Sequence, residues 1–238
     1  MWKNKAVSVI LPTYNERDSI ARDITGFFNT GYVDEVVVVN NNAVDGTDEE
    51  VAKTDARLVR EGRQGYGYAI RCGLREASGD LLVISEPDGT FSPDNIIKLL
   101  AYTDDFHIVY GSRTLNTMIW EGANMGLFLR HGNFFVAKLI EVFFNTTTLS
   151  DVGCTYRLLS RASAEVLMPR FTVGGSHFGL EMILLSIEKR IRFIQIPVNY
   201  QKRTGVSSVT GNRFKAFSLG MTMIWFAFCR RMSTLIRN

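Results

Sequence analysis

Two carboxylates, Glu86 and Asp88, stand two residues apart directly after the apolar run 81–84, with Pro87 and Gly89 setting a turn around them. An apolar run of this length bounded by turn residues predicts a buried strand. Open α/β sheets bind ligands at the carboxyl ends of their strands. Two acids on such a loop suit a hard divalent cation that keeps its other positions for water and substrate phosphates. A solvated acidic turn is the alternative, and the neighbouring motifs favour the metal site.

Polar residues also follow two other strand-like runs. The ring of Tyr14 could stack on a base, and Glu16 could accept a hydrogen bond from a base or a ribose. The amides of Asn40 and Asn41 could read a base edge or ribose hydroxyls. A helix-capping turn and an ordinary asparagine turn are the structural alternatives.

Glycine-rich and basic segments could bind phosphate. Gly65 and Gly67 open a predicted helix directly after Arg63. Such glycines can form a phosphate cradle at a helix start, or they can permit close packing of the helix on the sheet, and both interpretations stay open. The segment lacks the full dinucleotide fingerprint and carries no Walker lysine. Arg63 is the better candidate, because a guanidinium suits a diphosphate.

Arg113 follows another strand, where a phosphate contact or a structural ion pair would suit it. Arg203 and Ser207 lie in a loop of basic and small residues after the last predicted strand. This loop could bind a phosphate, and a solvated loop is the alternative.

Three further residues are candidates for acid–base chemistry or acceptor binding. Asp151 and Arg157 bracket an otherwise apolar segment, where the acid could orient or deprotonate an acceptor or the two could form an ion pair that pins a loop. Glu181 follows His177 by four residues, but a third metal ligand is missing. We therefore interpret Glu181 as a site-facing acid or a structural partner.

These residues are separated by segments that alternate between two periodicities. Strands are predicted at 6–11, 35–39, 56–59, 80–85, 106–110 and 193–198, and helices at 18–29, 66–77, 93–102, 128–144, a segment ending near 168, and 177–189. A loop is expected at 150–157. Strands that alternate with helices predict an α/β fold with a mostly parallel sheet covered by helices on both faces.

The bulk composition restricts the class of protein. The 238 residues are 46% hydrophobic and contain neither a linker nor a repeat, which favours one large domain, at 1–210, followed by a C-terminal helical segment at 211–238. A net charge of +3 is too small to indicate a nucleic-acid partner. Three well-separated cysteines and the lack of a signal-peptide pattern predict a reducing, cytoplasmic location.

The run 216–229 is 14 residues long and almost entirely apolar, with Arg213, Lys215, Arg230 and Arg231 beside it. It falls short of the ~20 residues that a membrane-spanning helix needs. Basic flanks around Trp225 and several phenylalanines suit a helix that lies on an anionic membrane surface. A core helix or a homo-oligomer interface is the alternative.

Together these motifs resemble the family-2 glycosyltransferases, and within them the polyprenyl-phosphate sugar synthases. The matching segments, over residues 6 to about 210, are 11–16, 45–47, 65–69, 77–80, 88–91, 111–113, 151–157 and 203–207. The resemblance implies a Rossmann-like GT-A fold, a nucleotide-sugar donor and a Mg²⁺ or Mn²⁺ ion. It also implies inverting transfer to a lipid phosphate or a glycan at the inner face of a membrane.

The resemblance also implies roles for single residues. It places Pro12, Tyr14, Glu16, Asn40 and Asn41 in the nucleoside pocket, Glu86 and Asp88 on the metal, Arg113, Arg203 and Ser207 on phosphate groups, and Asp151 and Arg157 on the acceptor side. The family usually has aspartates where this chain has Asn40 and Asn41, and Asp-x-Asp where it has Glu86-Pro87-Asp88. Uridine and guanosine donors both stay open. A non-catalytic sugar-nucleotide-binding protein and a sugar nucleotidyltransferase are the alternative functions.

Overall fold

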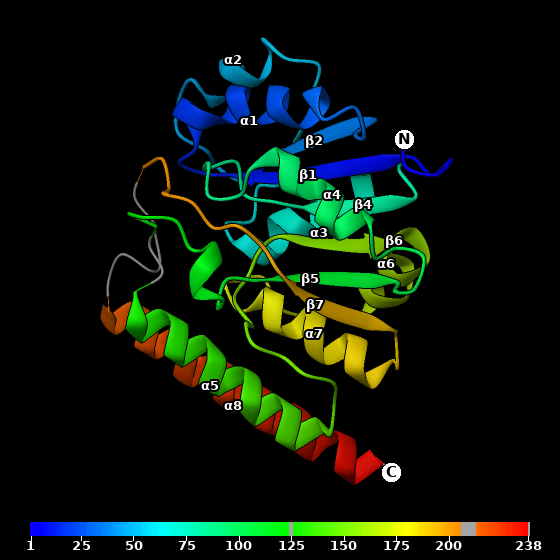
Figure 1. The fold of residues 1–238 in the computed structure, drawn as a ribbon, viewed down its shortest axis with the longest axis vertical. Coiled ribbons are helices and arrows are strands. Elements are labelled where there is room, and N and C mark those ends of the chain that lie inside the picture. Colours follow the sequence, from blue (N-terminus) through cyan, green and yellow to red (C-terminus); the bar gives the residue numbers. More distant parts are fainter. Residues whose placement is uncertain (124–125, 206–212, 238) are drawn as a thin grey trace.

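The computed structural model describes residues 1–123, 126–205 and 213–237, and these form one seven-stranded sheet with the order β3-β2-β1-β4-β6-β5-β7 (Figure 1). All neighbouring strands are parallel except at β6, which runs antiparallel to β4 and β5. The strands are β1 (Val7–Thr13), β2 (Glu35–Asn40), β3 (Arg57–Arg60), β4 (Leu81–Ile84), β5 (Ile108–Ser112), β6 (Arg157–Ser160) and β7 (Phe193–Pro197).

Helices cover both faces of the sheet. On one face lie α1 and α4, and on the other lie α3, α6 and α7, with α5 and α8 packed outside them (Figure 1). The α-helices are α1 (Arg17–Asn29), α2 (Thr47–Val51), α3 (Tyr66–Glu76), α4 (Ile96–Leu100), α5 (Leu127–Phe144), α6 (Arg161–Leu167), α7 (Phe178–Glu188) and α8 (Arg213–Arg237), and the 3-10 turns are η1 (Pro93–Asn95), η2 (Asn116–Met118) and η3 (Met168–Arg170).

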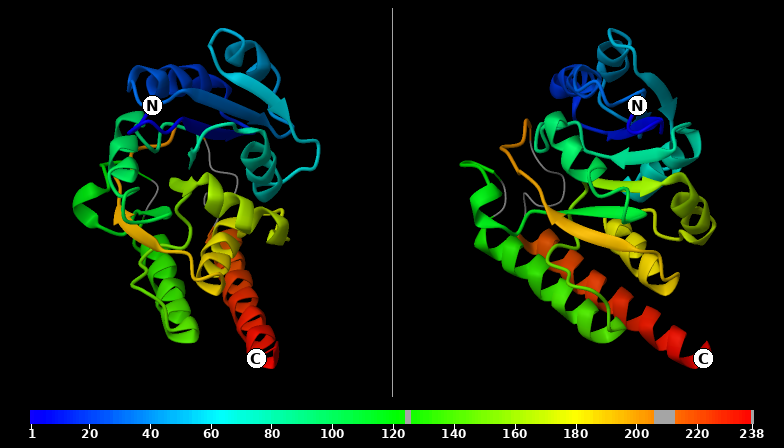
Figure 2. Two further views of the ribbon diagram at one scale, coloured as in Figure 1. Left: turned by 90° about the vertical axis from the view of Figure 1, so that its right-hand side faces the viewer. Right: turned by 45° about the vertical axis from the view of Figure 1, so that its right-hand side comes forward.

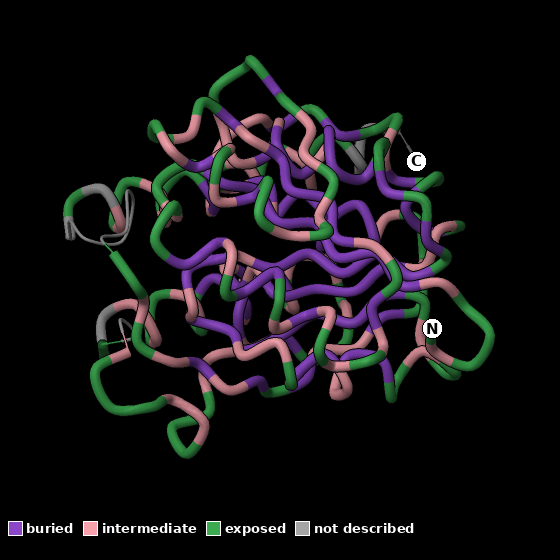
Figure 3. Tube along the Cα trace, turned by 90° about the horizontal axis from the view of Figure 1, so that it is seen from above, coloured by how far each residue is buried: buried purple, intermediate pink, exposed green. Residues whose placement is uncertain are grey.

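The valine run of β2 shows why the sheet needs two covered faces. Val37 and Val39 belong to the core on the α3 side, whereas Val36 and Val38 belong to the core on the α1 side. Successive side chains of a strand point to opposite faces, so an unbroken apolar run is stable only with helices on both sides. The central strands β1, β4 and β5 are fully buried and lie in the interior of the molecule, whereas the edge strand β3 has no buried residue (Figure 3).

The predicted α/β fold is confirmed, with a difference at β6. The sequence predicted a loop at 150–157 followed directly by a helix, whereas Arg157–Ser160 forms a four-residue strand between β4 and β5. The strand ends where the Oγ of Ser160 accepts a hydrogen bond from the backbone N of Ser163 (3.3 Å), which caps α6. A four-residue strand whose last residue, Ser160, also caps the next helix shows no strand periodicity in the sequence.

The C-terminal helix α8 has 25 residues and extends beyond the apolar run 216–229 at both ends. It packs against α5, and the two helices run in the same direction, with their C-terminal ends extending beyond the sheet (Figure 2). Within the described part of the chain, no helix is both long and apolar enough to cross a membrane. The division into domains at residue 211 stays a prediction.

Candidate active site

Three carboxylates meet one arginine at the carboxyl edge of the sheet. Glu16 begins α1 after β1, Glu86 and Asp88 follow β4, and Arg203 reaches them from the segment after β7. The Arg203 Nη2 lies 3.2 Å from Glu16 Oε1 and 3.1 Å from Asp88 Oδ2, and its Nη1 lies 3.9 Å from Glu86 Oε2. Residues 187 positions apart in sequence are thus brought into one charged cluster.

Asp88 is the most enclosed acid of this cluster, with no exposed surface. Its Oδ1 accepts hydrogen bonds from Thr90 N (2.9 Å) and Thr90 Oγ1 (2.6 Å), whereas its Oδ2 accepts none. Arg203 is close enough to Oδ2 for an ion pair but does not have hydrogen-bond geometry. A buried carboxylate oxygen with no hydrogen bond is costly unless a cation completes its surroundings.

Glu86 lies beside Asp88 in the same loop. Burial, followed by repulsion from the Asp88 carboxylate, raises the pKa of Glu86 to about 8, although Arg203 opposes the shift. Two carboxylates that cannot easily ionise together provide a local excess of negative charge. A divalent cation would relieve that excess.

Two residues of α1 form hydrogen bonds with the loop that carries these acids. Ser19 Oγ donates to Pro87 O (2.6 Å), and Gly89 N donates to Oδ2 of Asp23 (3.0 Å). Gly89 has φ +78°, a conformation that favours glycine. Asp23 is almost fully buried, and this burial raises its pKa. Asp23 was not predicted as a site residue, because an acid in a predicted helix carries no signal that it contacts a loop residue 66 positions away.

Tyr14 and Glu16 flank the open side of the cluster. The Tyr14 side chain is exposed. Oε2 of Glu16 accepts hydrogen bonds from the backbone N of Tyr14 (2.7 Å) and of Asn15 (2.8 Å), which fixes the turn after β1. Pro12 is buried within β1, opposite Val39. The Tyr14 ring is accessible to solvent, and its stacking on a base stays a prediction.

Asn41, in contrast, has no hydrogen-bonding capacity left for a base. Its Nδ2 donates to Glu61 O and Arg63 O (both 2.8 Å), and its Oδ1 accepts from Gly65 N (2.8 Å) and Gln64 Nε2 (3.4 Å). These four contacts saturate the amide. The structure therefore corrects the expected base contact and gives Asn41 the role of holding the 61–65 loop.

Asn40 is also engaged within the chain. Its Nδ2 donates to Asp48 Oδ1 (2.5 Å), and its Oδ1 accepts from Ala43 N (2.8 Å). The amide thereby links the end of β2 to α2. One donor and one acceptor position remain, so a ribose contact by Asn40 stays a prediction.

The predicted phosphate cradle at Gly65 and Gly67 is used for packing instead. The backbone N of Gly67 donates to Gly174 O (2.9 Å), and Tyr68 N donates to the same oxygen (3.3 Å). A Cβ on Gly65 would lie 2.3 Å from Gly174 O, and one on Gly67 would lie 2.6 Å from Val173 O. Close helix packing, the alternative left open above, is therefore the reason for both glycines.

Arg63 lies at the rim of this loop with its guanidinium exposed. It pairs with Glu61, at 3.1 Å from Nε to Oε1, and lies 4.5 Å from the centroid of the Tyr68 ring. The hydrogen bonds that Arg63 donates to the Glu61 carboxylate raise the pKa of Arg63. Its contact with a diphosphate stays a prediction.

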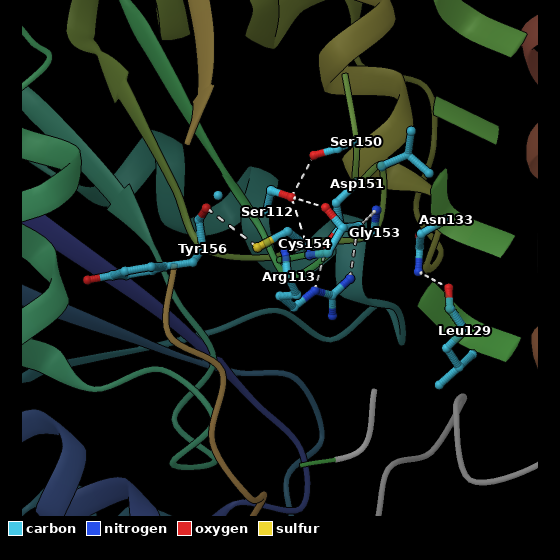
Figure 4. A network of polar contacts seen from close by, with 12 residues as sticks. Ser112, Arg113, Leu129, Asn133, Ser150, Asp151, Gly153, Cys154 and Tyr156 are labelled. Carbon is cyan, nitrogen blue, oxygen red and sulfur yellow. Dashed lines mark hydrogen bonds and ion pairs between the residues drawn. The ribbon is translucent and has the colours of Figure 1, made fainter. Parts of the chain in front are cut away.

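Arg113 and Asp151 form a buried bidentate pair (Figure 4). Arg113 Nε lies 2.9 Å from Asp151 Oδ2, Nη2 lies 3.1 Å from Oδ1, and the backbone N of Arg113 also donates to Oδ2 (3.0 Å). Burial alone would raise the pKa of Asp151, but Arg113 outweighs it and the pKa is lowered. A carboxyl with a lowered pKa is a weak proton acceptor, so the geometry favours the loop-pinning ion pair over a general base.

Two side chains that the sequence analysis missed support this pair. The Gln195 side chain bridges the strand and the loop, because its Oε1 accepts from Ser150 N (2.6 Å) and Asp151 N (3.1 Å) and its Nε2 donates to Gly111 O (3.2 Å). The ring of Tyr200 lies 5.3 Å from the Arg113 guanidinium. Both residues occur in or after β7, where the sequence shows only strand-like alternation.

Arg157 and Glu181 are also structural in this geometry. The Arg157 guanidinium is buried and donates to three backbone carbonyls, those of Cys154 (2.7 Å), Gly179 (2.5 Å) and Val152 (3.2 Å). Glu181 has no exposed surface and accepts from Thr172 N, Thr172 Oγ1 and Val173 N at 2.6–3.2 Å. These contacts correct the expectation that either side chain faces an acceptor or acts in catalysis.

The carboxylate cluster could hold a divalent ion through two of its side chains. Among the described residues there is no group of three or more histidine, cysteine, aspartate or glutamate side chains placed to hold a metal. Glu86 and Asp88 provide two carboxylates, and Asp88 Oδ2 lacks a hydrogen bond. Such a pair fits an ion that takes its other ligands from water and a substrate diphosphate. Ser207, a further predicted phosphate ligand, lies outside the described residues.

Comparison with known proteins matches residues 8–167, more than half of the chain, to the model of glycosyl transferase family 2. The chain belongs to this family. A hexosyltransferase of low-salt glycan biosynthesis, Agl6 of Haloferax volcanii, is 28% identical over 208 residues, which cover 85% of this chain and 49% of Agl6. The glycosyltransferase AglJ of the same organism is 26% identical over 83% of this chain and 64% of its own length. The chain therefore spans about half to two thirds of these relatives.

Solved structures confirm the GT-A fold. Glucosyl-3-phosphoglycerate synthase from Mycobacterium tuberculosis, in complex with Mn²⁺, UDP and phosphoglyceric acid, superposes with a TM-score of 0.73 at 17% identity, covering 96% of this chain and 78% of that one. The complex of the same enzyme with Mn²⁺, UDP and glucosyl-3-phosphoglycerate gives a TM-score of 0.71. At this identity the likeness concerns the fold alone.

Proposed function

We propose that this family-2 glycosyltransferase transfers a sugar, with inversion, from a nucleoside-diphosphate sugar to a lipid phosphate at a membrane surface. The observation that carries the proposal is the cluster at the end of β4, where Asp88 Oδ2 is buried without a hydrogen bond beside Glu86 and Arg203. Charge of this kind, at the carboxyl edge of an α/β sheet, suits a metal-bound diphosphate.

Different residues of the cluster would bind different parts of the donor. A Mg²⁺ or Mn²⁺ ion held by Glu86 and Asp88 would neutralise charge on the leaving diphosphate. Arg203, already within the cluster, adds a bidentate donor for phosphate oxygens. Tyr14 offers an exposed ring to the base. The similar solved enzyme binds UDP with Mn²⁺, which supports a uridine donor, and guanosine is the second choice.

The contacts of the two candidate general bases, Asp151 and Glu181, favour one class of acceptor. Asp151 is neutralised by Arg113 and its pKa is lowered, and the oxygens of Glu181 are bound by residues 172 and 173. Neither is suited to remove a proton from a sugar hydroxyl. A phosphate oxyanion is already a nucleophile and needs no base, which favours a phosphate acceptor.

The surface of α8 supports a lipid acceptor. A line of bulky apolar side chains, here called the α8 stripe, is exposed to solvent at intervals of three or four residues; it consists of Phe217, Met221, Trp225, Phe228 and Met232. This spacing places the stripe on one side of the helix. The segment also has a core face, because Met223 and Ala227 are buried in the core on the α3 side. The stripe stays exposed, and exposed apolar surface of this extent supports a membrane or protein contact.

The basic flank of this helix is smaller than predicted. Arg230 pairs with Glu188, at 2.7 Å from Nε to Oε1, and lies 3.6 Å from Glu181. Its charge is therefore used to join α8 to α7. The contact of Arg213 and Lys215, at the other end of the run, with an anionic surface is part of this proposal. We propose this surface contact as peripheral, and the cytoplasmic location stays a prediction.

Transfer assays test the donor and the acceptor together. The assay compares UDP- and GDP-linked sugars with polyprenyl phosphate or the matching polyprenol as acceptor, in the presence of Mn²⁺. We expect transfer to the phosphate and none to the alcohol. Equal transfer to both would contradict the phosphate assignment. Cleavage of the nucleotide sugar by pyrophosphate, without transfer, would favour a nucleotidyltransferase, and nucleotide-sugar binding without any turnover would favour a non-catalytic binding protein.

Flotation with vesicles of phosphatidylcholine and phosphatidylglycerol tests the α8 stripe. The wild type should float, and less so with added salt, because each basic residue near an anionic leaflet contributes about 1 kcal/mol. Trp225→Glu should stay in the dense fraction, whereas Thr25→Glu, the same charge change at an exposed site on α1, should float. A wild type that does not float but forms Trp225-dependent dimers would make the stripe an oligomer interface.

A further inference from the structure

Arg203 occupies the centre of the acidic cluster. Its guanidinium lies within 4.0 Å of Glu16, Glu86 and Asp88, and its side chain is only 20% exposed. The nearest contact, 3.1 Å from Nη2, is with the same Asp88 Oδ2 that accepts no hydrogen bond. In this state the arginine is the cation that neutralises the carboxylates.

The backbone brings Arg203 to this position. Gln201 N donates to Thr90 O (2.9 Å), and Thr204 N donates to Asp88 O (2.8 Å). These two bonds attach residues 201–204, here called the strap, along the Asp88–Thr90 turn. Arg203 lies between the two attachment points. The two backbone hydrogen bonds of the strap therefore hold the Arg203 side chain close to the carboxylates.

The Arg203 guanidinium and a divalent ion would compete for the same two carboxylates. Both are stabilised by the Glu86 and Asp88 carboxylates, and both repel another positive charge at a few ångströms. Within a weakly solvated site such repulsion is strong. The free protein therefore has a competitor for the metal built into its own chain.

We propose that Arg203 is the resident counter-cation of the metal-free site and that it suppresses metal binding until a donor diphosphate arrives. This inference rests on the proposed function. The diphosphate gives the guanidinium a new anionic partner and at the same time supplies oxygens to the metal. Metal and donor then raise each other's affinity, which is a coupling free energy between the two ligands.

Mn²⁺ binding without any sugar tests this inference. The electron paramagnetic resonance signal of free Mn²⁺ is titrated with wild type, Arg203→Gln and Lys202→Gln, each with and without UDP or GDP. Lys202→Gln is the matched control, since it removes the same charge from the adjacent exposed residue. Removing the competing charge should tighten binding of Mn²⁺ alone by about tenfold or more, whereas the control should resemble the wild type.

Thermal unfolding provides a second measurement that does not depend on activity. In chelator, Arg203→Gln should melt at a lower temperature than Lys202→Gln, because its carboxylates lack their cation. Mn²⁺ alone should raise the melting temperature of Arg203→Gln more than that of wild type. If Arg203→Gln does not fold in chelator but is recovered by Mn²⁺, the inference is supported in the same way.

The outcomes separate this inference from the proposed function. If wild type binds Mn²⁺ with the nucleoside diphosphate, but Arg203→Gln binds Mn²⁺ alone no better than wild type, the resident-cation inference is wrong and the metal-dependent function stands. If Lys202→Gln tightens Mn²⁺ binding as much as Arg203→Gln, the effect is one of general charge and the inference is also wrong. If no variant binds Mn²⁺ even with the nucleoside diphosphate, both fail.

Discussion

The asparagines after β2 and the acids after β4 lie at the same edge of the sheet, yet their polar atoms are occupied to different degrees. All four hydrogen-bonding positions of Asn41 are filled by residues 61–65. Asp88, equally buried, has one carboxylate oxygen without a hydrogen bond and two acidic neighbours around one arginine. The Asn41 amide is complete as it stands, whereas the acid cluster carries more negative charge than Arg203 alone can balance.

This difference teaches how to separate structural from ligand-binding polar residues. Buried polar groups are normally paired, so a saturated amide contributes to stability and has nothing to offer a ligand. A buried acid without a full set of partners is stable only in a context that supplies one, and a ligand can do so. Substitutions in the first region should lower stability, whereas substitutions in the second should lower activity.

The largest effect is expected at Asp88. Asp88→Asn removes a metal-binding carboxylate and should lower kcat by about 10³-fold, the scale seen when a strong electrostatic contact to the transition state is lost. Its free energy of unfolding should stay close to that of wild type, because the change also removes charge repulsion. Initial rates with Mn²⁺ and urea unfolding measure both quantities. Asp94→Asn, at an exposed site, is the control, and a tenth of wild-type activity remaining in Asp88→Asn would place the metal elsewhere.

The next largest effect is expected on stability, at Asp151. Asp151→Asn leaves the buried Arg113 without its partner, which should cost about 3–5 kcal/mol in the free energy of unfolding at pH 7. Urea unfolding at several pH values measures it.

The pH dependence of Asp151 has a defined sign. Because its pKa is lower in the folded protein than the ordinary value of 3.8, its contribution is fully present above that value and is lost as the pH falls through the folded pKa. The difference between wild type and Asp151→Asn should therefore shrink below about pH 4. A difference that stays constant down to acid pH would show that the ion pair is not its source.

Asn41→Ala tests the saturated region, where a loss of stability is expected rather than a loss of nucleotide binding. It leaves the backbone groups of the 61–65 loop unpaired and should lower the free energy of unfolding by about 2–3 kcal/mol. Chemical denaturation measures the loss, with the exposed Asn116→Ala as control. If Asn41→Ala is instead as stable as wild type and weakens only nucleotide binding, Asn41 reads the base after all.

The smallest effect is expected at Tyr14. Tyr14→Ala removes a stacking surface worth about 1–3 kcal/mol per base, so the Kd of a nucleoside diphosphate should rise about tenfold. Tyr14→Phe keeps the ring and should bind like the wild type. Fluorescence or calorimetric titration distinguishes the two variants, and equal losses in both would assign the effect to the hydroxyl group.

The order of strands and helices could be predicted because the apolar runs have clear periods and ends. The valine run of β2 and the helical spacing of Ile20, Ile24 and Phe27 in α1 each indicate an element. β6 was missed because four residues between a loop and a helix cap show no periodicity. Helix α8 lies within the helical segment expected at 211–238, and it continues beyond the apolar run 216–229 into charged residues at both ends.

The site could be predicted only in part. Acids that follow an apolar strand can be recognised by position, so Glu86 and Asp88 could be proposed as metal ligands from the sequence, and that role stays a prediction. The partners of Asn41, Arg157 and Glu181 lie 3 to 24 residues away in sequence, and only the fold shows that their polar atoms are used. The same limit explains why Asp23 and Gln195, which support the loops from neighbouring elements, carried no sequence signal.

The central claim is that the Glu86–Asp88 cluster binds a donor diphosphate through a divalent ion. Calorimetric titration of UDP, GDP and ADP into wild type and Asp88→Asn, with Mn²⁺ and with chelator, tests it most directly. The account predicts that UDP or GDP binds best, that chelator weakens this binding strongly in wild type, and that Asp88→Asn binds weakly in both conditions. Equal affinity in all four combinations of protein and metal, or ADP as the tightest ligand, would contradict the account.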